Sequence, residues 1–252
     1  MKNKVSIVTA TYNSSKYIEE TYESIRNQSF SDWEWLVTDD ASTDDTFEKL
    51  ENICKSNDRV RAFRNAINSG AAVSRNNSLE YASGEFIAFI DADDTWHPSK
   101  LTQQIKFMTD NSLDFSFTAY TLIDEDGNHL DKSVDSKNTG FFNYRDMLAK
   151  KATLGCSTVI LSRKALGELR MPNIRTGQDY AFWLMILKRG FVAYIFPSKL
   201  TNYRISQNAI SRNKFKKALR QWEIYRRIEG LGAFISLYYF VFYAIRALFR
   251  KE

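Results

Sequence analysis

The chain contains few of the residues that interrupt or cross-link regular structure. Its 252 residues include three prolines, ten glycines and two cysteines. So little proline and glycine excludes a collagen-like or linker-rich design. Cys54 and Cys156 lie too far apart for a CxxC pair or a zinc pattern, so we expect two reduced thiols in a cytosolic chain. No apolar signal core follows Met1–Lys4, and we therefore do not expect secretion.

Three common nucleotide or metal motifs are also missing. No glycine follows the first expected strand, residues 4–10, which argues against the GxGxxG loop of dinucleotide-binding folds. The sequence has no GxxxxGKS/T motif, and this excludes a P-loop. Neither of the two histidines, His97 and His129, has a partner at metal-ligand spacing, so a histidine-based zinc site is not expected.

The chain also lacks a long hydrophobic run. Its longest uncharged stretch near the end, residues 230–245, is rich in Tyr and Phe but shorter than the ~20 residues needed to span a bilayer. Just before it, between Arg212 and Arg227, basic residues are opposed only by Glu223. We therefore expect 213–252 to be a helical tail that binds an anionic membrane surface. A tilted span, or a helix packed on the chain's own core or on a second subunit, stays open.

The pattern of hydrophobic segments predicts an α/β fold. Strands are expected at 4–10, 33–38, 59–64 and 85–90, with helices at 15–28, after 39–45 and at 70–82. Such alternation indicates a mainly parallel sheet flanked by helices. A more mixed second half follows, with strands near 113–123, 157–162, 192–196 and 199–205, a hairpin turn at 124–128 and a helix at 179–190.

Polar residues follow several of the expected parallel strands. Ligands of such sheets bind at the carboxyl ends of the strands, where Thr9, Asp39 and Asp91 fall. Asp91 and Asp93 could hold Mg²⁺ or Mn²⁺, which prefer oxygen ligands and bridge to phosphate, although an acidic turn after a strand is commonly just solvated. Arg75 is either a surface helix charge or a contact to a nucleotide diphosphate.

A second acidic candidate lies much later in the chain. Asp179 begins a helix after Gly177. A carboxylate there could simply interact with the helix dipole. It could also be the general base that removes a proton from a sugar hydroxyl.

Four ordered stretches of the sequence resemble the family 2 glycosyltransferases, which have the so-called GT-A fold. They are VSIVTATYNSSKYIEETYESIRNQSF, WEWLVTDDASTDDT, NSGAAVSRNNSLEYASGEFIAFIDADD and GQDYAFWLMILKRG. The likeness runs from about residue 4 to 212 and is greatest to transferases of teichuronic acid, O-antigen and capsule assembly. It implies a catalytic domain at 1–212, with a nucleotide-sugar half at 1–95 and an acceptor half at 96–212, followed by the tail at 213–252.

The resemblance implies roles for the residues of the donor half. Thr9 and Asp39 would contact the uracil of a UDP-sugar, with Tyr12 packing nearby and Asp40 helping. Arg75 would face the nucleotide. The DAD motif, Asp91-Ala92-Asp93, would bind ribose and the metal, with Asp93 coordinating Mn²⁺ or Mg²⁺ and Asp91 helping to position it.

The later motifs imply the acceptor side. Asp179 would be the catalytic base, and Trp183 would line the acceptor site, although a core aromatic is an equal reading. Two departures concern this half: Gln178 replaces a common Glu, and the YRxH pattern reads Tyr203-Arg204-Ile205-Ser206. A histidine metal ligand is therefore absent, while Arg204 could still reach phosphate. In the first half, the DDGS motif usual in the family is replaced by Asp39-Asp40-Ala41-Ser42.

These implications together predict an inverting, metal-dependent transferase that moves a sugar from a UDP-sugar, with a β-linkage formed. The acceptor would be a lipid-linked saccharide, such as an undecaprenyl-diphosphate glycan, at the cytoplasmic face of the plasma membrane. A homodimer is possible, and nucleic acid is not an expected partner. Two alternatives remain open: a nucleotidyltransferase of related fold, which normally carries a glycine-rich, lysine-bearing loop, and a basic-tailed nucleic-acid-binding module.

Overall fold

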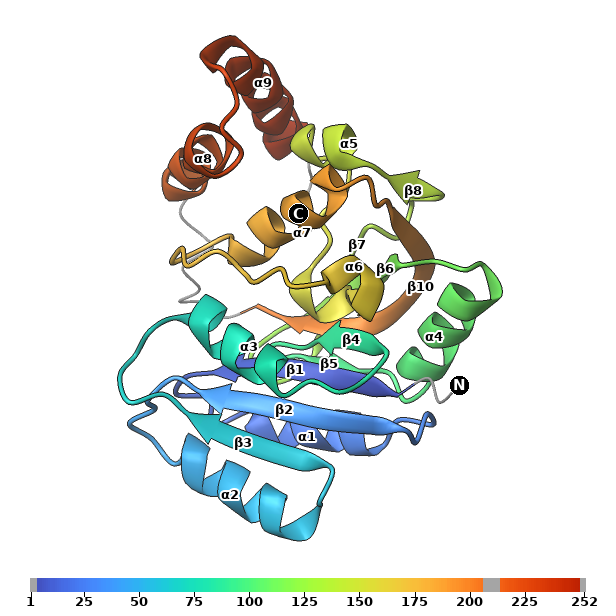
Figure 1. Cartoon of the computed structure of the whole chain (residues 1–252), viewed down its shortest axis with the longest axis vertical. Coiled ribbons are helices and arrows are strands. Elements are labelled where there is room, and N and C mark those ends of the chain that lie inside the picture. The colour runs from blue at the N-terminus through green and yellow to red at the C-terminus, as the bar shows by residue number, and fades with distance from the viewer. Residues whose placement is uncertain (1–3, 206–213, 250–252) are drawn as a thin grey trace.

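The computed structural model describes residues 4–205 and 214–249, and it contains one mixed sheet with helices on both faces (Figure 1). The strands, in spatial order, are β3 (Val60–Arg64), β2 (Trp33–Asp39), β1 (Val5–Thr11), β4 (Phe86–Phe89), β9 (Ile160–Ser162), β6 (Phe115–Ile123), β10 (Ala193–Arg204) and β5 (Thr95–Trp96). At the side, β7 (His129–Val134) pairs with β6, and β8 (Phe141–Phe142) pairs with β10. The first four strands are parallel, which confirms the predicted sheet.

Apolar side chains on the two faces of the sheet form two cores. Against one face pack α1 (Ile18–Arg26), α2 (Thr46–Ser56) and α4 (Lys100–Asp110), through residues such as Ile25, Leu50 and Leu101. Against the other face pack α3 (Ala71–Glu80), α5 (Tyr144–Leu148), α6 (Arg163–Leu166) and α7 (Gln178–Lys188). Because each core is continuous across several strands, the sheet edge that carries the candidate residues rests on a rigid support.

The second half differs from the expected elements in three places. The two strands expected at 192–196 and 199–205 form one strand, β10, which has irregular register between Phe196 and Thr201. The strand expected at 157–162 begins as a 3₁₀ turn, Cys156–Thr158, and becomes extended only from Ile160. The short helices α5 and α6 were not expected, because neither is long enough to show a helical period.

The C-terminal elements share the core of the rest of the chain. They are α8 (Lys214–Glu223), a π-helical turn (Ile224–Ile228) and α9 (Ala233–Phe249). Ile224 and Tyr225 are buried in the core beside α7, and the Tyr225 hydroxyl donates to the carbonyl of Leu148 at 2.5 Å. Among the described residues, no helix is long and apolar enough to cross a membrane.

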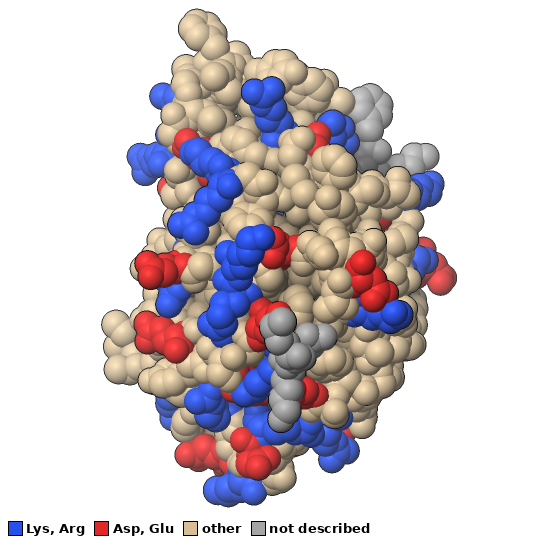
Figure 2. Space-filling view, turned by 45° about the vertical axis from the view of Figure 1, so that its right-hand side comes forward, with Lys and Arg blue, Asp and Glu red and all other residues tan. Residues whose placement is uncertain are grey.

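One face of α9 packs on the protein and the other is open. Tyr239 and Phe240 face inward, where Phe240 meets Trp222. The outward side carries exposed apolar side chains: Phe234, Ile235, Leu237, Tyr238, Val241 and Ile245. Figure 2 shows an upper end of the molecule that is largely uncharged, with Lys and Arg side chains beside it.

A buried lysine predicts a measurable pH dependence of stability. Lys100 is fully buried, its ammonium donates to Gln104 at 2.6 Å, and burial lowers its pKa from 10.5 to about 7. Between these two pH values the unfolded chain binds a proton that the folded chain lacks. The free energy of unfolding should therefore rise with pH, by up to about 1.4 kcal/mol per pH unit from this group. In Lys100→Met that contribution should vanish, as thermal unfolding at pH 7 to 10 would reveal; identical slopes in both proteins would contradict it.

Candidate active site

The carboxyl ends of the parallel strands bring the predicted residues to one edge of the sheet. In register, Thr11 ends β1 beside Asp39 of β2, which lies beside Arg64 of β3. Next to β1, β4 ends at Phe89 and leads into Asp91. The order of the strands therefore places the Asp39 end and the DAD motif on the same edge, as the sequence predicted.

Asp39 presents an unpaired oxygen at this edge. Its side chain is fully buried; Oδ2 accepts from the backbone N–H of Ser42 at 3.0 Å and lies 3.3 Å from Nε of Arg64. Its Oδ1 has no partner, and neither has the hydroxyl of Thr11 in the adjacent strand. Buried polar atoms without partners are rare, so these two atoms indicate where a polar ligand would complete the structure. Tyr12 follows directly and is 47% exposed.

Thr9 does not reach the surface of this edge. It is fully buried, and its hydroxyl accepts from the indole N–H of Trp35 at 2.9 Å. Thr11 lies two residues later on the same face of β1, and its hydroxyl has no partner. The strand extends to Thr11 rather than ending near residue 10.

The carboxylate of Asp40 is engaged in hydrogen bonds to nearby residues rather than open to a ligand. Its Oδ1 accepts from Asn65 at 2.7 Å and from the N–H of Ser69 at 2.8 Å, and its Oδ2 accepts from the N–H of Gly70 at 2.7 Å. Gly70 has a φ of +93°, which favours glycine, and precedes α3. Asp40 thus fixes the start of the helix that carries Arg75.

Arg75 pairs with the DAD motif and lies within electrostatic range of Asp179 in α7. Its guanidinium is buried and lies 2.5 Å from Asp91. Burial alone would lower the pKa of Arg75, but the acidic groups of Cys156, Asp91 and Asp179 raise it. Two of its nitrogens, Nε and Nη1, have no partner. Arg75 is thus a buried cation near two carboxylates, and two of its hydrogen-bond donors have no partner. Such a group suits an anionic ligand such as a diphosphate.

Asp93 is a buried carboxylate whose environment favours a cation. Burial and the charge of Asp91 raise the pKa of Asp93 to about 6. The negative charges of Asp91 and Asp93 repel each other, and a divalent cation between them would remove that repulsion. Among residues 4–205 and 214–249 no cluster of three or more Asp, Glu, His or Cys side chains could hold a metal. Asp91 and Asp93 nevertheless fit Mg²⁺ or Mn²⁺, since such ions commonly take one or two carboxylates and complete their shell with water and phosphate oxygens.

The turn that carries these carboxylates is anchored from behind. The Ser157 hydroxyl donates to Asp94 at 2.5 Å and accepts from the N–H of Asp91 at 3.0 Å. Asp94 also accepts from the N–H of Arg204 at 2.9 Å. Thr21 donates to the carbonyls of both Ala92 and Asp94. The carboxylate of Asp94 thus supports the turn, and Ala92 contributes its backbone carbonyl.

If Asp91 and Asp93 bind a metal, this anchoring predicts that Ser157→Ala weakens metal-dependent activity. The change removes both bonds to the turn, and loss of a group that orients metal ligands typically lowers metal affinity by roughly 10–100-fold. The metal concentration for half-maximal activity measures the effect. Ser116→Ala is the control, because Ser116 is equally buried but bonds Gln104, away from the turn. Equal metal dependence in the two variants would contradict the role given to Ser157.

Asp179 lies in the first turn of α7, after Gly177 in the left-handed conformation. Burial raises the pKa of Asp179, while the positive charge of Arg75 opposes the rise. The structure therefore brings Asp179 into electrostatic contact with Arg75 and Asp91, although they are distant in sequence. The preceding Gln178 has a buried Oε1 without a partner. A buried carboxyl of raised pKa beside a cation suits a general base.

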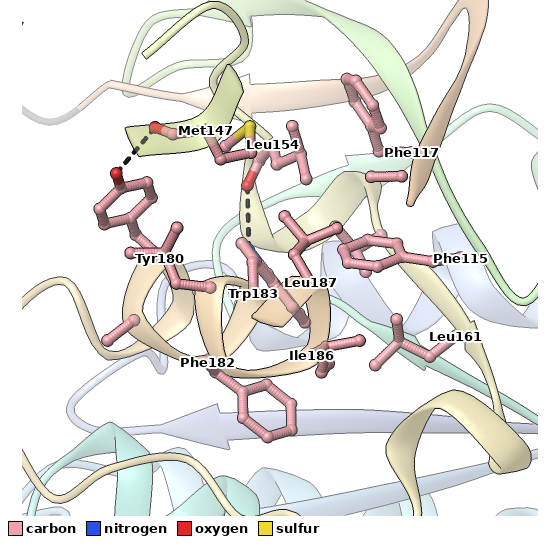
Figure 3. Close-up of a cluster of buried hydrophobic side chains, with 14 of the residues drawn as sticks. Phe115, Phe117, Met147, Leu154, Leu161, Tyr180, Phe182, Trp183, Ile186 and Leu187 are labelled. Carbon is pink, nitrogen blue, oxygen red and sulfur yellow. Dashed lines mark hydrogen bonds between the residues drawn. The ribbon is translucent and has the colours of Figure 1, made fainter. Parts of the chain in front are cut away.

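Two predicted site residues have other roles. Trp183 is fully buried among Phe89, Phe115 and Phe182, and its indole donates to the carbonyl of Leu154, so the core reading holds (Figure 3). Because α7 has apolar residues on nearly every side, its sequence did not show which of them point into the core.

Arg204 is not available to phosphate either. Its guanidinium donates to Glu20 at 2.6 Å and to the carbonyls of Asp93, Asp124 and Glu125. It ties α1 and the β6–β7 turn to the acidic turn. Ser157 and Thr11 belong to the candidate site but were not identified from the sequence, and only their place beside quoted motifs could have suggested them.

Comparison with known proteins decides the family. The glycosyl transferase family 2 model matches residues 6–170. The chain belongs to glycosyl transferase family 2. This glycosyltransferase is 43% identical over 250 residues to the putative teichuronic acid biosynthesis glycosyltransferase TuaG of Bacillus subtilis, covering 99% of this chain and 98% of the relative.

Two further proteins are similar to this glycosyltransferase. It is 36% identical to WfgD of Escherichia coli, named as a UDP-Glc:α-D-GlcNAc-diphosphoundecaprenol β-1,3-glucosyltransferase, over 96% of this chain and 92% of that one. Its fold matches residues 1–349 of S. aureus TarS in complex with UDP-GlcNAc, with a TM-score of 0.76, 21% identity, and coverage of 98% of this chain and 73% of that one. The GT-A fold predicted from the motifs is thereby confirmed.

Proposed function

We propose that this glycosyltransferase moves a sugar from a UDP-sugar to a lipid-linked saccharide, with inversion at the anomeric carbon, during assembly of a bacterial surface polysaccharide. The observation that carries the proposal is the buried Arg75, which pairs with Asp91 of the DAD turn, interacts electrostatically with Asp179 and keeps two unpaired donors. The relatives' names support the donor and acceptor class. Family membership decides against the nucleotidyltransferase and the nucleic-acid module.

The residues of the donor half would hold the nucleotide at two points. The unpaired oxygens of Asp39 and Thr11 would bind the uracil, with Tyr12 against the ring. Asp91 and Asp93 would hold Mn²⁺ or Mg²⁺, which when bound neutralises charge on the leaving diphosphate. Arg75 would donate to the same phosphates and stabilise the charge that develops there.

Asp179 would act on the acceptor. It takes the proton of the acceptor hydroxyl while the oxygen attacks the anomeric carbon from the side opposite the diphosphate. The new glycosidic bond forms as the bond from carbon to the UDP oxygen breaks, so an α-linked donor yields a β-linked product. The division into a donor half at 1–95 and an acceptor half at 96–212 belongs to this proposal.

Transfer to a defined acceptor tests the function. We would incubate the protein with Mn²⁺, UDP-glucose, UDP-galactose or their N-acetyl forms, and a GlcNAc-diphosphate-lipid acceptor. Transfer of one sugar with a β-linkage, read from the proton coupling at the new anomeric carbon, is the expected result. UDP-sugar hydrolysis without transfer, or an α-linked product, would overturn the proposal.

The outward face of α9 would hold the protein at the cytoplasmic face of the plasma membrane. Its apolar side chains lie near exposed basic residues: Lys216, Lys217, Arg226, Arg227 and Arg246. An apolar helical face with basic neighbours binds anionic bilayers by lying in the interface.

This attachment predicts a loss of vesicle binding in the double variant Leu237→Asp, Val241→Asp. Two charges in the apolar face should lower the affinity for anionic vesicles by at least about tenfold, because each buried apolar side chain adds about 1.5 kcal/mol or more. Flotation with vesicles measures it. Ile67→Asp is the control, since Ile67 is 73% exposed on the loop before α3. Unchanged flotation of the double variant would show that α9 does not attach the protein to the membrane.

A further inference from the structure

An apolar groove lies between α5 and α9, at the upper end of the molecule in Figure 1. Its lining includes Tyr144, Arg145, Leu148, Leu231, Ile235 and Tyr238. We call it the α5–α9 groove. Ile235 and Tyr238 are more than half exposed, so their side chains are open to a ligand. Exposed apolar side chains that line a concave surface commonly mark a binding site.

The groove is joined to the candidate base by one short path. Tyr180, the neighbour of Asp179, donates its hydroxyl to the carbonyl of Met147 in α5 at 2.8 Å (Figure 3). Leu148, the next residue, lines the groove. This bond ties the first turn of α7, which carries Asp179, to α5, which forms one side of the groove.

Basic residues lie along the same path. Lys150 places its ammonium 3.0 Å from the centre of the Tyr180 ring, and its charge acts on Asp179. Arg145 is an exposed lining residue of the groove. One cationic side chain thus acts on Asp179, and a second lines the apolar groove.

We propose that the α5–α9 groove binds the first isoprene units of the polyprenyl chain of a lipid-linked acceptor, with Arg145 and Lys150 beside its diphosphate. The proposal rests on the proposed function. The three parts of a saccharide-diphosphate-polyprenol each find a counterpart here: Asp179 for the hydroxyl, Lys150 and Arg145 for the anion, and the groove for the hydrocarbon. Neither a flat bilayer nor a second copy of the chain accounts for this combination.

The experiment compares acceptors that share one saccharide diphosphate and carry one, three or eleven isoprene units. The assays use the full chain in neutral detergent micelles, so that attachment to a bilayer plays no part. For the wild type, KM should fall as the chain lengthens. In the double variant Ile235→Ser, Tyr238→Ser, the KM for the longer acceptors should rise roughly tenfold, while the KM for the one-unit acceptor stays unchanged.

Leu237→Ser, Val241→Ser is the matched control, because both residues are exposed on α9 but do not line the groove. Its KM should follow the wild type at every chain length. A KM independent of chain length in the wild type, or equal effects of the two double variants, would overturn the proposal. So would a dimer in solution that only the groove variant dissociates, since a second copy would then occupy the groove. Absence of transfer to any acceptor, by contrast, would refute the proposed function itself.

Discussion

Replacing Asp179 by Asn should lower kcat by roughly 10²–10⁴, the range found when a general base is lost. Asn keeps the size and the hydrogen-bonding shape of the side chain but accepts no proton at neutral pH. Because burial raises the pKa of Asp179, the carboxyl is a stronger base than an exposed aspartate. UDP affinity should stay close to that of the wild type, since Asp179 contacts the acceptor in this account.

Two controls separate this loss from a change of fold. UDP binding and thermal unfolding of Asp179→Asn should match the wild type. Gln178→Glu restores the acid pair common in the family and should retain activity, because the base stays in place. Wild-type turnover in Asp179→Asn would show that another group removes the proton.

The second large effect is expected for Asp93→Asn. This change removes one of the two carboxylates that fit the cation. Lewis-acid stabilisation of a leaving phosphate provides several kcal/mol, so kcat/KM should fall by roughly 10³. More Mn²⁺ should restore part of the loss, because the defect lies in metal binding.

Asp94→Asn is the matched control for Asp93→Asn. An Asn oxygen at position 94 can still accept from the N–H of Arg204, and its amide can donate to the hydroxyl of Ser157. We therefore expect a much smaller loss of kcat/KM than in Asp93→Asn. Equal losses in the two variants would mean that the turn acts only as a scaffold and that Asp93 holds no metal.

The parallel half of the fold could be predicted from sequence because its signals are local. Each buried strand is a short apolar run that ends at a polar group, and the helices between strands have clear apolar faces. Asp39, Asp91 and Asp93 therefore fell at the correct edge. Thr9 and Thr11 lie on the same face of β1, and the sequence alone does not show that Thr11 is the one whose hydroxyl lacks a partner.

The rest of the site depends on contacts between distant parts of the chain. Nothing near Arg204 in sequence shows that Glu20 and the turn at 124–125 take its donors. Ser157 reads as an ordinary serine until its bonds to the turn at 91–94 are seen. Likewise, α9 has apolar residues on both faces, and only its packing shows that one face is covered by the protein.

The central claim is that Asp39, Arg75 and the DAD turn form one site for a UDP-sugar. Calorimetric titration of the full-length protein with UDP, with and without Mn²⁺, tests it most directly. We predict binding that strengthens markedly with Mn²⁺ and that loses this gain in Asp93→Asn. No binding of UDP in either condition, or binding that Mn²⁺ and Asp93→Asn leave unchanged, would contradict it.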